Sequence, residues 1–252
     1  MGYVLAPIVS AVIGAVVGSF VTLVADRMPR GENWATGRSS CHACGHALRA
    51  HEMVPLISFA LQRGRCARCR VALPADLWMG EAGGALVAVI AFERGGDPAG
   101  MLALALFGWA LVLLALLDAR HLWLPDAITL PLAGGGLLAG LVLPVPGMRE
   151  RAFGLVLGWL ALEALRRGYR RLRHRDGMGG GDPKLLGAIG AWLGASALPL
   201  VVLCAALLGL GWAGVQAARG RPAGGAVPIP LGTMFALTAL GWVAAGWAAV
   251  FA

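Results

Sequence analysis

Residues 100–117 read GMLALALFGWALVLLALL and contain no charged side chain. A helix of this length is about 27 Å long at about 1.5 Å per residue, close to the thickness of the hydrocarbon layer of a bilayer. Because lipid offers no partner for backbone N–H and C=O groups, such a run is expected to be helical. The stretch therefore predicts a helix that crosses a membrane.

Seven further apolar runs have the same character. They cover residues 3–25, 78–92, 127–146, 151–166, 185–197, 198–216 and 229–250. The chain of 252 residues is 58% hydrophobic and 13% charged, whereas soluble domains are about 45–50% apolar and about 25% charged. We therefore predict an all-α polytopic membrane protein with about eight transmembrane helices. No basic segment precedes the first run, so we expect a retained helix and not a cleaved signal peptide.

Basic residues are concentrated in four of the segments between these runs. Of the 21 Lys and Arg residues, 18 fall in segments 26–77, 118–126, 166–184 and 217–228. Basic loops of membrane proteins face the cytoplasm, so we predict that these segments are cytoplasmic and that both termini lie outside. Three arginines are then on the outer side: Arg94, Arg149 and Arg151. This pattern also accounts for the net charge of +8, and we expect no nucleic-acid partner.

The polar segment 26–77 contains two Cys-x-x-Cys pairs, Cys41 with Cys44 and Cys66 with Cys69. Each pair can point two thiolates at one metal ion, and two pairs complete a tetrahedral site. We predict a structural zinc ion with these four ligands, in a small cytoplasmic zinc-ribbon-like insert. The alternative is a pair of redox disulfides, which the reducing cytoplasm disfavours.

The insert divides the chain into three parts. We expect a first transmembrane helix at residues 1–25, the zinc-binding insert at 26–77 and the main helical bundle at 78–252. The 38 glycines are scattered through the apolar runs, which suits close packing between transmembrane helices.

Three aspartates stand where apolar runs meet the predicted cytoplasmic segments. Asp118 follows the run that ends at residue 117, Asp126 precedes the fourth run and Asp182 precedes the sixth. Ionisable groups near the hydrocarbon boundary are functional candidates. For Asp126 the simpler interpretation is that it caps the helix that begins at Ala127. Asp118 ends a helix, where a negative charge opposes the helix dipole, so we expect no structural role for it.

Asp182 follows a glycine-rich stretch, Gly177-Met-Gly-Gly-Gly181. Asp182 can also cap a helix, because Pro183 is a favoured first helical residue, but capping does not explain the glycines. Consecutive glycines let a substrate strand approach the backbone closely. Two neighbouring aspartates can share a proton, so that one activates a water molecule and the other protonates a departing amine. Asp118 and Asp182 are therefore the candidate catalytic pair.

Four segments carry a family resemblance. They are GSFVTLVADRMPR at 18–30, HEMVPLISFALQRGRC at 51–66, LLDARHLWLPDAITLP at 116–131 and GMGGGDPKLLGAIGAWLG at 177–194. In this order they resemble the type IV prepilin peptidase family, the bifunctional leader peptidases and N-methyltransferases of pilus and type II secretion systems. The last segment is similar to the family's Gly-x-Gly-Asp motif.

The resemblance implies that Asp118 and Asp182 are catalytic, that Asp126 is not, and that Lys184 matches a family lysine. The implied substrate is a prepilin or pseudopilin with a short basic leader and an apolar helix in the lipid bilayer. Cleavage is implied at the cytoplasmic face of a bacterial inner membrane, in the service of pilus or type II secretion machinery. The family then methylates the new N-terminus with S-adenosylmethionine.

Some positions depart from the family pattern. Pro183 replaces a usually aliphatic or aromatic residue, and the segment PIPLGTMFALTAL at 228–240 matches only loosely. Glu81 matches an acidic family position; it either serves methyl transfer or pairs with a neighbouring polar group. Two alternatives stay open at this point: a peptidase without methyl transfer, and a non-catalytic membrane scaffold for assembly.

Overall fold

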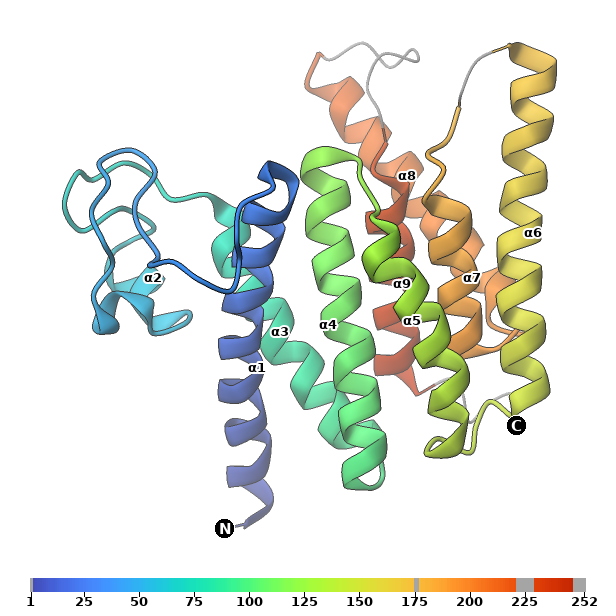
Figure 1. Ribbon diagram of the computed structural model, residues 1–252, viewed down its shortest axis with the longest axis horizontal. Helices are drawn as coiled ribbons and strands as arrows, with labels where there is room; N and C mark the ends of the chain where they lie inside the picture. The colour runs from blue at the N-terminus through green and yellow to red at the C-terminus, as the bar shows by residue number, and fades with distance from the viewer. Residues whose placement is uncertain (1, 175–176, 221–228, 247–252) are drawn as a thin grey trace.

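A computed structural model describes residues 2–174, 177–220 and 229–246 of the chain. This part is helical, and apart from two isolated bridges it contains no β-structure. Its long helices run side by side (Figure 1). They are α1 (Gly2–Arg27), α3 (Ala75–Arg94), α4 (Pro98–His121), α5 (Asp126–Leu138), α6 (Met148–Arg173), α7 (Asp182–Leu193), α8 (Leu198–Ala218) and α9 (Leu231–Ala245).

Each predicted apolar run overlaps one of these helices, so the predicted all-helical membrane architecture is confirmed. Four segments are long and apolar enough to cross a membrane: Leu5–Arg30, Ala75–Arg94, Pro98–His121 and Leu198–Ala218. The chain breaks between α7 and α8 near Ser196, as predicted, and Pro199 lies in the first turn of α8. Residues 247–250, the end of the last predicted run, lie outside the described residues.

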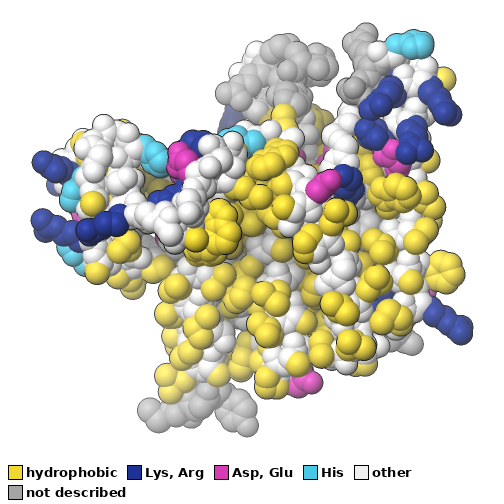
Figure 2. All heavy atoms as spheres, viewed as in Figure 1, with side chains coloured by type: hydrophobic (Ala, Val, Ile, Leu, Met, Phe, Trp, Pro, Cys, Tyr) yellow, Lys and Arg dark blue, Asp and Glu magenta, His cyan; other side chains and the backbone are white. Residues whose placement is uncertain are grey.

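The C-terminal ends of α1, α4, α6 and α8 lie at the same end of the bundle, as Figure 1 shows. These ends lead into the segments that the distribution of basic residues assigns to the cytoplasm. Figure 2 shows hydrophobic side chains over the visible side of the bundle, with Lys and Arg gathered on the insert and at one end of α6. This arrangement suits a protein whose sides face lipid and whose basic end faces the cytoplasm.

Glycines bring two pairs of helices into close contact. On the α1–α3 interface, a methyl group at Gly84 would overlap the carbonyl oxygen of Gly14. On the α6–α7 interface, a methyl group at Gly190 would overlap the carbonyl oxygen of Gly154. The predicted role of glycine in helix packing is therefore confirmed.

The short helix α7 is the centre of the larger core. Its side chains from Leu185 to Trp192 are buried, and it packs against α5 and α6. The indole ring of Trp192 stacks on Phe107 of α4, with 4.6 Å between ring centroids, and its N–H donates to the carbonyl of Leu132. This packing holds α7, whose first residue is Asp182, in the core.

Arg151 is fully buried at the other end of the bundle and contacts backbone carbonyls. Its guanidinium donates to the carbonyls of Gly136, Ala191 and Trp192, at 2.9, 3.2 and 3.2 Å, near the ends of α5 and α7. Arg94 likewise donates to the carbonyl of Ala244 at the end of α9. Two of the three arginines predicted outside therefore stabilise the negative ends of helices.

Candidate active site and metal centre

Asp118 lies in the last turn of α4 and is only 4% exposed. Its Oδ2 accepts a hydrogen bond from the backbone N–H of Thr233, at 2.7 Å, and lies 3.1 Å from the Thr233 hydroxyl, which is also 3.0 Å from the carbonyl of Ala115. The backbone N–H of Gly232 is a further donor to this carboxyl group. The expectation that Asp118 has no structural role is therefore wrong, because it binds the free N–H groups at the start of α9. The negative charge of Asp118 is unfavourable at the C-terminus of α4 but favourable at the N-terminus of α9.

Asp182 is the first residue of α7 and is 6% exposed. The backbone N–H of Gly179 donates to its carboxyl group, so the glycine stretch folds back over the aspartate. A methyl group at Gly179 would approach Asp182 Oδ2 to 3.1 Å, and one at Gly177 would overlap the ring of Tyr169 on α6. These glycines allow the loop to lie close to both side chains.

The fold brings Asp118 and Asp182 together, although 64 residues separate them in sequence. Leu124, in the turn after α4, packs between the two motifs, because methyl groups at Gly181 and Gly232 would both collide with it. Helices α4, α7 and α9 therefore converge on one pair of buried carboxyl groups.

Asp126 does not cap α5, which corrects the simpler interpretation of this residue. Asp126 is the first residue of the helix, and the cap position is taken by Pro125, which has no side-chain group that could form a capping hydrogen bond. The carboxylate of Asp126 instead binds Lys184, whose Nζ lies 2.6 and 2.7 Å from its two oxygens. The pair joins the motif around Asp118 to the motif around Asp182.

Thr233 and Gly232 are site residues that sequence reasoning did not single out. They belong to segment 228–240, which matched the family only loosely. A threonine after a glycine carries no chemical signature by itself, and its role follows from the contact between α9 and α4.

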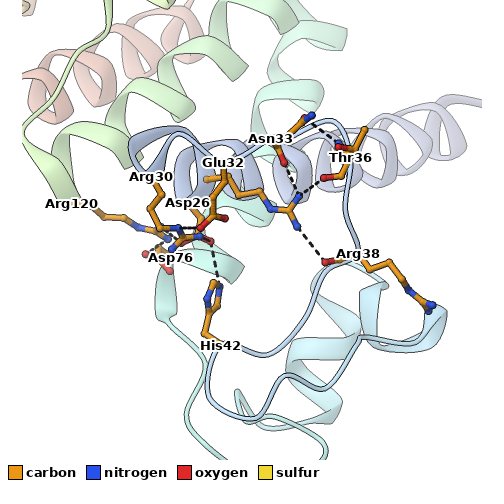
Figure 3. A network of polar contacts seen from close by, with 10 residues as sticks. Asp26, Arg30, Glu32, Asn33, Thr36, Arg38, His42, Asp76 and Arg120 are labelled. Carbon is orange, nitrogen blue, oxygen red and sulfur yellow. Dashed lines mark hydrogen bonds and ion pairs between the residues drawn. The ribbon is translucent and has the colours of Figure 1, made fainter.

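A polar network lies on the opposite side of the end of α4 (Figure 3). Arg120, two residues after Asp118, forms ion pairs with Asp26 of α1 and Asp76 of α3. Residues two apart on a helix point to nearly opposite sides, so Arg120 faces α1 and α3 whereas Asp118 faces α9. His42, next to Cys41, lies 3.3 Å from Asp26. The network therefore connects the insert to the helix that carries Asp118.

The four cysteines Cys41, Cys44, Cys66 and Cys69 come together in the insert. Their Sγ atoms all lie within 4.8 Å of one another, and all four thiols are free. Cys41 Sγ and Cys69 Sγ are 3.8 Å apart. Tetrahedral Zn–S bonds of about 2.3 Å place neighbouring sulfurs roughly 3.8 Å apart, so this arrangement can bind a zinc ion.

Both cysteine pairs have the same backbone geometry. Cys41 N donates to His46 O and Cys66 N donates to Val71 O, each at 2.9 Å. Since zinc binds thiolates, metal binding at this cluster would release protons from the thiols.

Glu81 of α3 pairs with neighbouring polar groups, the second of the two roles considered for it. Its Oε1 accepts from Ser19 of α1 at 3.0 Å, and its Oε2 accepts from the backbone N–H of Leu56 in the insert at 2.7 Å. The carboxylate therefore holds the insert against the first two long helices.

Comparison with known proteins agrees with this architecture. Residues 12–94 match the family described as Bacterial Peptidase A24 N-terminal domain, and residues 105–214 match the Type IV leader peptidase family. The prepilin leader peptidase/N-methyltransferase of Burkholderia pseudomallei (strain K96243) is 38% identical over 90% of this chain and 85% of its own length. The chain belongs to the type IV leader peptidase family.

Proteins with the same description from other organisms are also similar to this chain. That of Aeromonas hydrophila is 37% identical over 85% of this chain and 73% of its own length. The protein of Pseudomonas aeruginosa is 33% identical over 93% of this chain and 88% of its own length. No solved structure matches the chain. In this leader peptidase family member, the N-terminal match contains the cysteine cluster and the second match contains Asp118 and Asp182, whereas Thr233 lies beyond both.

Proposed function

We propose that this protein is a membrane-embedded aspartic endopeptidase that removes the leader peptides of type IV prepilins or pseudopilins and then N-methylates the new N-terminus. One observation supports the peptidase activity above all others. Two buried carboxyl groups from separate motifs, Asp118 and Asp182, lie beside Leu124 at the basic end of a helical membrane protein.

Asp118 and Asp182 are the proposed catalytic residues. Two carboxyl groups at close range share a proton, because both do not ionise readily together. One then takes a proton from the attacking water, and the other gives a proton to the departing amine. The product is a leader with a new carboxyl terminus and a mature chain with a free amine.

The proposed setting is a bacterial inner membrane with the carboxyl pair at its cytoplasmic face. We assign eight spans, with α5, α6, α7 and α9 crossing beside the four longer or more apolar helices. Helix α7, with 12 residues, is about 18 Å long and shorter than the hydrocarbon layer, but the surrounding helices bury it. A substrate helix in the same bilayer would bring its cytoplasmic end, and the scissile bond, to the level of the two aspartates.

The proposed metal site has a structural role. Cys41, Cys44, Cys66 and Cys69 would hold one zinc ion, and four thiolates leave no open position for a reacting group. Zinc would stabilise an insert that has few buried apolar residues of its own. The methyl donor is S-adenosylmethionine, and the proposed partners are prepilins, the lipid bilayer and pilus or type II secretion machinery.

Mass spectrometry of a prepilin incubated with the detergent-solubilised protein tests both activities. We expect loss of the leader with or without S-adenosylmethionine. We expect one added methyl group on the mature chain only when S-adenosylmethionine is present. Loss of the leader without methylation would favour a peptidase that lacks methyl transfer. A precursor that stays whole with several prepilins would favour the scaffold alternative.

A further inference from the structure

The insert between α1 and α3 has an unpaired apolar surface. The short helix α2 (Ile57–Leu61) and the turn before it expose four large hydrophobic side chains. They are Met53, Val54, Ile57 and Leu61, with 46%, 41%, 59% and 80% of their surface exposed. Ile57 and Leu61 are four residues apart, so they lie on the same face of α2. A cytoplasmic loop surrounded by water has no reason to present such a surface.

Two contacts fix the depth of this surface along the bundle. Leu56, directly before α2, donates its N–H to Glu81 at 2.7 Å. Glu81 is six residues inside α3, which begins at Ala75, and is therefore about 9 Å below the start of that helix. Figure 1 shows α2 level with the upper part of α1, not above its end.

The second contact comes from a different part of the insert. Trp34 packs edge-to-face on Phe20 of α1, with 5.9 Å between ring centroids. Phe20 lies seven residues before Arg27, the last residue of α1, which corresponds to about 10 Å along the helix. Both rings are about half exposed. Tryptophan is enriched at the boundary between lipid and water.

The charges around α2 match an anionic lipid surface. The stretch that follows the helix exposes four arginines. They are Arg63, Arg65, Arg68 and Arg70. Figure 2 shows Lys and Arg side chains on the outer side of the insert and hydrophobic side chains along its lower edge. Amphipathic segments with this composition lie about 5–10 Å deep at the boundary between headgroups and acyl chains.

We propose that α2 and the turn before it bind the cytoplasmic leaflet of the membrane, with Met53, Val54, Ile57 and Leu61 in the acyl-chain boundary and the arginines among the phospholipid headgroups. Trp78 and Met79, in the first two turns of α3, are exposed hydrophobic side chains as well. The insert is then an interfacial module held at the membrane surface, not a domain free in the cytoplasm. This inference does not depend on the proposed enzymatic activity.

Photo-crosslinking of the full-length protein in vesicles of phosphatidylethanolamine and phosphatidylglycerol tests the proposal. Benzoylphenylalanine replaces Leu61 in one variant and Leu172 in the control. Leu172 is a matched position, because it is 83% exposed but lies in the last turns of α6 beside Arg171 and Arg173. Benzoylphenylalanine at Leu207, exposed on the apolar helix α8, serves as the lipid-facing reference.

We expect the yield of phospholipid adduct at position 61 to be close to the yield at position 207. It should be at least about fivefold higher than the yield at position 172. A yield at Leu61 no higher than at Leu172 would overturn the proposal. A prepilin adduct in place of lipid, when prepilin is added, would also overturn it and identify the surface as a substrate site. Equal zinc content in all variants verifies that the insert is folded in each.

Discussion

Thr233 donates its backbone N–H to Oδ2 of Asp118 at 2.7 Å, and its hydroxyl lies between the same oxygen, at 3.1 Å, and the carbonyl of Ala115, at 3.0 Å. The backbone N–H of Gly232 is a further donor to this carboxyl group. The orientation of the Asp118 carboxyl group therefore depends on the contact between α4 and α9.

Thr233→Val tests this orientation. The variant keeps the backbone donor but loses the hydroxyl, so we expect a roughly tenfold lower kcat for leader cleavage with little change in KM. Thr233→Ser should restore the rate. Thr238→Val is the matched control on the same helix, since the Thr238 hydroxyl bonds to carbonyls of its own helix. Equal rates for Thr233→Val and the wild type would show that the hydroxyl does not orient Asp118.

The ion pair between Lys184 and Asp126 is partly exposed, so its expected contribution is small. Pairs of this kind are worth about 1 kcal/mol or less. Lys184→Met and Asp126→Asn should each slow cleavage only about two- to fivefold, and the double variant should be no slower than either. Additive effects of the two substitutions would mean that the residues act independently.

Arg151→Met removes the buried guanidinium that contacts the carbonyls of Gly136, Ala191 and Trp192. We expect a loss of about 2–4 kcal/mol in the free energy of unfolding, because buried carbonyls lose a charged donor. Arg149→Met on the same helix is the control, since Arg149 is exposed. Thermal unfolding in detergent measures both, and equal stability of the two variants would argue against the capping role.

Cys66→Ser should lower the zinc content of the purified protein and make the insert sensitive to protease. Both effects follow from the loss of one of four thiolate ligands. Cys204→Ser, on α8, should keep the metal and the resistance to protease. Metal analysis with limited proteolysis measures this, and full zinc content in Cys66→Ser would contradict the four-cysteine site.

Much of the fold was accessible from the sequence, because lipid permits few backbone arrangements. Apolar runs gave the helices, and the basic segments correctly grouped the helix ends that lie together in Figure 1. The two cysteine pairs likewise predicted a cluster from local spacing alone. Both patterns are local, and this is why they are visible in one sequence.

The sequence was less informative where function depends on contacts between distant segments. Nothing near Asp118 indicates that its partner is the start of α9, 115 residues later. The ion pair of Asp126 with Lys184 was missed for the same reason, since helix capping is a local interpretation and the pair is a tertiary contact. The depth of the insert also depends on contacts with Phe20 and Glu81 across long separations.

Intact-mass analysis of a prepilin after incubation with four forms of the protein tests the proposed catalytic pair directly. They are the wild type, Asp118→Asn, Asp182→Asn and Asp126→Asn. We expect the wild type and Asp126→Asn to remove the leader, and neither Asp118→Asn nor Asp182→Asn to do so. Leader removal at the wild-type rate by either Asp118→Asn or Asp182→Asn would contradict the proposed catalytic pair.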